Sequence, residues 1–201
     1  MHKKLLASCF VLLALLPGSA QGQIAWETPM LMSPNAPDGL GLYLMDVAGG
    51  DIGLMVGWRA PGSSWGLRGG IAEAGGDDDL GVFGGLDFAG DVHRETASFP
   101  LDVDWFAGIG VGASSDAVIT VPLGLTFGHT FQADNAVFVP YVAPRIFLDA
   151  FIGDEREDEV DLGLSIDLGV DFRLSRARGA PVIRFGASVG DHEGLALGVV
   201  F

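Results

Sequence analysis

The sequence predicts an all-β fold: a closed, antiparallel, up-and-down transmembrane β-barrel of about ten strands, with eight as the alternative count. Three observations lead to this prediction. Apolar residues alternate with small or polar ones over ten segments, which places the two kinds on opposite faces of strands. Hydrophobic residues make up 49% of the 201 residues, yet after residue 22 no apolar run approaches the ~18 residues of a membrane helix. Clusters of Gly, Ser, Asp and Asn separate the segments, as turns require.

The first 22 residues have the pattern of a cleaved signal peptide. Lys3 and Lys4 precede an apolar stretch that ends in small residues, and cleavage after Ala20 or after Gly22 fits the small-residue rule. Removal of this segment leaves nine basic residues, all arginine, against 26 acidic ones. Because so acidic a chain offers no basic face for phosphates, we expect no nucleic-acid partner.

Residues 23–38 follow as an irregular leader. Pro29, Pro34 and Pro37 interrupt any regular pattern there, while Trp26 and Met30 to Met32 are apolar. We expect this leader either to plug the periplasmic mouth of the barrel or pack beneath it, or to remain disordered ahead of the barrel.

Residues 39–201 carry the ten strand segments. Most segments are close to the ~9–11 residues that a tilted strand needs to cross a bilayer, longer than the ~5–6 residues of a typical soluble-sheet strand. The connection over 90–100 is long for one side of such a barrel, which keeps eight strands as the alternative. The predicted segments are 39–48, 51–60, 64–74, 79–89, 101–113, 117–131, 136–150, 159–174, 181–190 and 192–201.

The final segment adds a more specific signal. Leu195, Leu197, Val199 and Phe201 share one face, and an aromatic residue ends the strand. In this it resembles small bacterial outer-membrane β-barrel proteins, a likeness of pattern that covers residues 39–201. The resemblance implies an outer-membrane location, contact with outer-membrane lipid, and recognition of Leu197, Val199 and Phe201 by the barrel-assembly machinery.

The glycine-rich face of the strands also carries charged residues, which the barrel would enclose. Buried charges must pair, so we expect a salt-bridged interior that fills the barrel, or a polar path for small solutes. A barrel of eight or ten strands is mostly filled by side chains, which disfavours an open channel. The predicted lumen charge cluster is Arg59, Arg68, Asp87, Asp102, Asp104, Asp167, Asp171, Arg173 and Arg184.

Catalytic motifs are absent from the sequence: it has no Gly-x-Ser-x-Gly, no His-Glu-x-x-His and no phosphate-binding loop. Of the histidines, His129 falls on the lipid-facing side, His93 in the 90–100 connection, and His192 in a turn where we expect it to be solvated. The sequence predicts no cofactor and no metal site. The favoured function is a non-enzymatic membrane barrel for envelope structure, surface interaction or slow solute passage; the alternatives are a barrel enzyme acting on lipid or peptide, and a soluble periplasmic ligand-binding β-domain.

Overall fold

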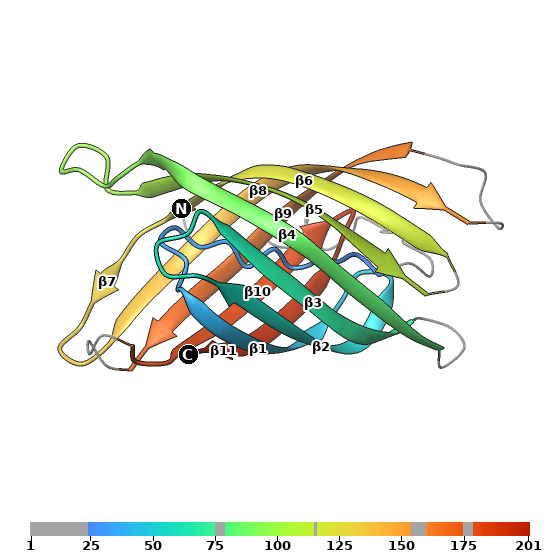
Figure 1. Cartoon of the computed structure of the whole chain (residues 1–201). Helices are drawn as coiled ribbons and strands as arrows, with labels where there is room; N and C mark the ends of the chain where they lie inside the picture. Colours follow the sequence, from blue (N-terminus) through green and yellow to red (C-terminus); the bar gives the residue numbers. More distant parts are fainter. Residues whose placement is uncertain (1–23, 75–78, 115, 154–159, 175–178) are drawn as a thin grey trace, which may run out of the picture.

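The computed structural model describes residues 24–74, 79–114, 116–153, 160–174 and 179–201 (Figure 1). The predicted signal peptide, the acidic turn at 75–78 and the acidic residues 154–159 lie outside these residues. The described part of the chain is all-β. Its strands are β1 (Gly39–Asp46), β2 (Gly50–Arg59), β3 (Trp65–Ala74), β4 (Asp79–His93), β5 (Asp102–Ala113), β6 (Ala117–Gly128), β7 (Phe131–Gln132), β8 (Val137–Ile152), β9 (Val160–Arg173), β10 (Val182–Gly190) and β11 (Gly194–Val200).

Ten of these strands form a closed antiparallel barrel. Each strand pairs with its neighbours along the chain, and β1 closes the ring by pairing with β11, with Gly41 opposite Val200 and Asp46 opposite Leu195. β6 pairs directly with β8, while the two-residue β7 adds to the edge of β8 beyond the ring. The prediction of a closed up-and-down barrel of about ten strands is confirmed.

The eight-strand alternative is wrong, and the long connection over 90–100 has a local explanation. β4 does not end near residue 89 but continues to His93, and its ladder with β5 continues to the pair His93–Val103. A small turn closed by hydrogen bonds between Thr96 and Phe99 completes the connection. The two strands therefore extend past their neighbours, and no extra hairpin is needed.

The barrel has two distinct ends. At the terminus end lie the start of β1, the end of β11, and the connections β2–β3, β4–β5, β6–β8 and β9–β10. At the loop end lie the connections β1–β2, β3–β4, β5–β6, β8–β9 and β10–β11.

Burial alternates along the strands because successive side chains point into and out of the barrel. In β1, Leu40, Leu42 and Leu44 are exposed, whereas Tyr43 and Met45 are buried. The buried apolar side chains of the wall pack against residues 24–33, which run inside the barrel (Figure 1). The core therefore consists of one inner face of a single sheet and a segment enclosed by it.

Glycine on the inner face makes room for the large enclosed side chains. A Cβ atom built on Gly85, Gly108 or Gly110 would lie 2.3–2.8 Å from atoms of the Trp26 ring. Gly169 and Gly198 leave the same kind of space for Tyr141 and Tyr43. The wall thus approaches its contents closely at these positions, as glycine in a strand allows.

Candidate functional site

The N-terminal segment threads the barrel along its length. At the loop end, Ala25 N donates to Ala48 O in the β1–β2 turn at 3.1 Å. At the terminus end, Asp38 accepts a hydrogen bond from Gly62 N at 3.2 Å, beside the start of β1. Residues 24–33 between these points are buried, and Trp26 and Glu27 are fully so. We call residues 24–38 the plug. It occupies the barrel from end to end, and not only one mouth.

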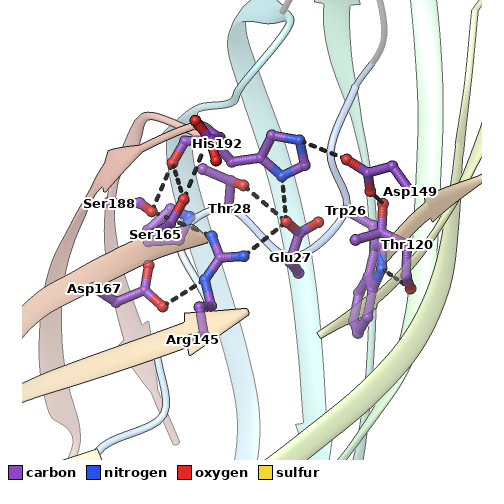
Figure 2. Close-up of polar contacts among 12 residues, drawn as sticks. Trp26, Glu27, Thr28, Thr120, Arg145, Asp149, Ser165, Asp167, Ser188 and His192 are labelled. Carbon is purple, nitrogen blue, oxygen red and sulfur yellow. Dashed lines mark hydrogen bonds and ion pairs between the residues drawn. The ribbon is translucent and has the colours of Figure 1, made fainter. Parts of the chain in front are cut away.

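A buried polar cluster holds the plug near the loop end (Figure 2). We call it the loop-end cluster: Glu27, Arg145, Asp149, Asp167 and His192. Glu27 Oε1 accepts from Arg145 Nη1 at 2.9 Å and lies 2.6 Å from His192 Nδ1. Arg145 also donates through Nε to Asp167 at 3.0 Å. One carboxylate of the plug is therefore bound by two cationic side chains of the barrel.

His192 closes this cluster from the β10–β11 connection. Its Nε2 lies 3.1 Å from Asp149, and its ring stacks on Phe147 with ring centroids 4.0 Å apart. An ionised carboxylate only accepts hydrogen bonds, so two carboxylates on one imidazole require both ring nitrogens to carry protons. Burial alone would lower the pKa of His192, but the Glu27 charge and hydrogen bonds to Asp149 and Glu27 outweigh it and raise the pKa to about 9. His192 is therefore an imidazolium at neutral pH.

Trp26 ties the same cluster to the neighbouring strand β6, where Thr120 is the ladder partner of Asp149 in β8. Its Nε1 donates to the carbonyl oxygen of Thr120 at 3.1 Å, and the Thr120 hydroxyl donates to Asp149 at 2.6 Å. Figure 2 shows these contacts beside the Glu27 carboxylate. The plug is thus held on one side of the lumen by β6, β8 and the β10–β11 connection.

A second cluster lies near the terminus end. We call it the terminus-end cluster: Ser33, Arg59, Arg68, Asp87, Asp171 and Arg184. Asp87 pairs with Arg59 and, at 3.2 Å, with Arg68. Arg68 also donates through Nη2 to the carbonyl oxygen of Met30 in the plug at 2.7 Å. Arg184 donates to Asp171 at 2.7 Å and to the Ser33 hydroxyl at 2.9 Å, which again joins the wall to the plug.

The other predicted lumen charges lie close by. Asp104 pairs with Arg94 at 3.0 Å and accepts from Asn35 N, and Asp102 accepts from Asn35 Nδ2 and from Glu95 N. Arg173 is only partly buried, and its Nε is buried without a hydrogen-bond partner among the described residues. The structure thus brings eight of the nine predicted residues into polar contacts: Arg59, Arg68, Asp87, Asp102, Asp104, Asp167, Asp171 and Arg184.

The sequence reasoning missed most of the loop-end cluster. Arg145 and Asp149 share the period-2 parity of the buried Tyr141, so the alternation of β8 contained the signal for both. Glu27 stood in a leader without periodicity, and no pattern placed it inside the barrel. The prediction of a solvated His192 is wrong: the side chain is almost wholly buried. Its turn folds inward because the ring bonds to Glu27 and Asp149.

The cluster lacks the arrangement of a catalytic dyad. Both ring nitrogens of His192 face carboxylates, and the hydroxyls of Ser165 and Ser188 contact its backbone carbonyl oxygen and not the ring. Among the described residues no group of three or more His, Cys, Asp or Glu side chains could hold a metal ion. The chemistry these contacts supply is attachment of the plug.

The predicted assembly-signal residues lie on the outer side of the barrel. Leu197 is exposed, Val199 is partly exposed, and Phe201 is 63% exposed beyond the last residue of β11. Phe201 N donates to Leu40 O at 2.9 Å, and Leu40 N donates to Phe201 O, so this residue joins the closing seam with β1.

Comparison with known proteins adds no assignment. No family model, curated protein or solved structure matches the chain. Within the residues that the structure describes, no helix is long and apolar enough to cross a membrane.

Proposed function

We propose that this protein is a bacterial outer-membrane β-barrel without enzymatic activity, whose lumen is closed by its own N-terminal plug. It serves envelope structure or surface interaction, and any solute passage is slow because the plug must first move. Its outer face contacts outer-membrane lipid, and the barrel-assembly machinery is its partner during insertion.

One observation carries the membrane location. Each of the ten barrel strands exposes large apolar side chains on its outer face, among them Leu42 in β1, Leu54 in β2, and Leu164 in β9. A continuous apolar exterior of this extent is unfavourable in water and is what a barrel in lipid requires. Leu168 of β9, which pairs with Ala187 near the middle of β10, is 41% exposed and is typical of this band.

Aromatic side chains support the same proposal. Trp58, Trp65 and Trp105 are 38–41% exposed and lie on the terminus-end halves of β2, β3 and β5. The rings of Trp58 and Trp65 meet edge to face with centroids 5.6 Å apart. Exposed tryptophans at one level of a barrel are typical of the boundary between hydrocarbon and water.

The closed lumen supports a role other than that of a general pore. The buried plug is attached by the loop-end and terminus-end clusters, and its apolar residues Trp26, Met30 and Met32 fill the space between them. An open porin lumen is polar and filled with water. We therefore expect recordings from planar bilayers to show no stable open channel; a steady porin-like conductance would contradict the closed lumen.

Membrane fractionation tests the location directly. We expect the protein in the outer-membrane pellet, with a gel mobility that shifts on boiling. Leu168→Arg should block insertion, because a charge on the lipid face near the membrane midplane costs about 2–4 kcal/mol, whereas Val160→Arg at the strand end should insert. Release of the wild type with the periplasmic contents, or equal insertion of both variants, would refute the proposal.

Cysteine labelling tests which end faces outward. The only cysteine in the sequence is Cys9, in the predicted signal peptide, so single cysteines can be introduced cleanly. We expect a membrane-impermeant maleimide to label Asp51→Cys at the loop end on intact cells, and Ser64→Cys at the terminus end only after lysis. The reverse pattern would invert the proposed orientation.

A further inference from the structure

The terminus-end cluster borders a small cavity that the attachment of the plug does not explain. The cavity has a volume of about 40 Å³, and it lies between the plug residues Met32 and Pro37 and the inner faces of β1, β2, β3 and β10. A cavity of this size holds a few water molecules or one small ion. Its charged lining consists of Arg59, Arg68, Arg184 and Asp87.

The charges around this cavity do not balance. Three guanidinium groups line it, with the single carboxylate of Asp87; outside the lining, Asp171 pairs with Arg184 and the charge of Asp38 acts on Arg59, so the positive excess belongs to the cavity wall itself. This excess of positive charge stands in a chain whose formal net charge is −15. The local field therefore favours an anion, opposite to the field of the protein as a whole.

Hydrogen-bond donors remain available at the cavity. Arg59 uses only Nη2 in its contacts with described residues, to Asp87 and to the weakly accepting sulfur of Met32, which leaves Nε and Nη1 without a partner there. Arg184 bonds through Nε and Nη2, so its Nη1 is likewise unused among these residues. Arg68, by contrast, uses all three of its nitrogens.

We propose that this cavity binds a small oxyanion, a carboxylate or a phosphate, between Arg59 and Arg184. The planar fork of N–H groups on an arginine matches the two oxygens of such a group, and two guanidinium groups facing one space can share it. Hydrogen bonds to the anion satisfy the N–H groups of Arg59 that do not bond to Met32 or Asp87. The cavity volume limits the ligand to a group of a few atoms, or to the charged end of a larger molecule that enters from the terminus end.

This site is independent of the proposed membrane function, because the residues that form it belong to the barrel interior in any surroundings. Titration calorimetry of the detergent-purified full-length barrel tests it. Inorganic phosphate and acetate are added in separate experiments, with the ionic strength matched by sodium chloride. Saturable binding of either anion is expected, and the comparison of the two shows which oxyanion the site prefers. Absence of saturable binding for both anions to the wild type overturns the proposal.

Variants locate the binding. Arg59→Gln should weaken it at least tenfold, while Asp87 keeps its pairing with Arg68. Arg59→Lys keeps the charge but loses the fork, so binding should weaken here too. Arg94→Gln is the matched control, since Arg94 lies at the same end, pairs with Asp91 and Asp104, and does not line the cavity. If Arg94→Gln weakened anion binding as much as Arg59→Gln does, the assignment of the site would be overturned.

Discussion

The substitution Glu27→Gln removes the charge that holds the plug while conserving the shape of the side chain. Glu27 is the plug residue to which both Arg145 and His192 bind, at 2.9 and 2.6 Å. The neutral amide of the variant can still accept one hydrogen bond but no longer balances either cation. Arg145 keeps Asp167, and His192 keeps Asp149, so the barrel wall retains its own pairs.

The size of the effect follows from these contacts. The rise in the pKa of His192 from 6.5 to about 9 corresponds to about 3 kcal/mol of stabilisation, which Glu27 shares with Asp149. The hydrogen bond to Arg145 joins two charged groups and contributes about 1.5–3 kcal/mol. We expect Glu27→Gln to lower the free energy of plug attachment by about 3–4 kcal/mol, within the ~3–5 kcal/mol typical of breaking a buried ion pair.

Tryptophan fluorescence can report on the plug alone. Of the four tryptophans, Trp26 is buried in the lumen, and Trp58, Trp65 and Trp105 are exposed outside. With the outer three replaced by Phe, the emission of Trp26 during urea unfolding follows release of the plug. In this background, the Glu27→Gln variant should release the plug at a clearly lower urea concentration than the protein with Glu27.

A matched control exists elsewhere in the barrel. Glu95 also lies beside a histidine, with its Oε2 2.9 Å from His129 Nδ1, but its side chain is 46% exposed. Glu95→Gln should therefore cost less than about 1 kcal/mol, as exposed pairs do. Equal effects of Glu27→Gln and Glu95→Gln, or no effect of either, would refute the view that the plug is held by a buried ionic clamp.

Two further predictions concern pH and packing. A histidine with a raised pKa contributes its full stabilisation below pH 6.5 and loses it as pH rises through about 9. Urea titrations should therefore show that the free energy of plug attachment falls by about 3 kcal/mol over that interval. A stability that does not change with pH would contradict the role of His192. Gly85→Ala places a Cβ 2.3 Å from the Trp26 ring and should cost about 1–3 kcal/mol, whereas at neighbouring Gly84 the nearest atom is at 3.4 Å. Gly84→Ala should leave Trp26 emission unchanged, and equal shifts in both variants would contradict the packing described.

The sequence alone determined the wall of the barrel. Alternation places Leu162, Leu164 and Leu168 on one side of β9 and Asp167 and Asp171 on the other, because successive strand residues must face opposite ways. Strand length and turn residues then led to ten strands. These are local properties, readable within one segment, so the predicted boundaries fall within a few residues of those observed, apart from the extension of β4 to His93.

Only the tertiary structure decided what fills the barrel. Closing the ring brings β8, β9 and the β10–β11 connection around the plug, and Glu27 meets His192 across 165 positions of sequence. No periodicity relates two such residues. The predicted lumen charges could be placed on the inner face, but their partners depend on strand register and on the path of residues 24–38. Backbone alternation is a local rule, whereas pairing of buried charges is satisfied only once the chain has closed on itself.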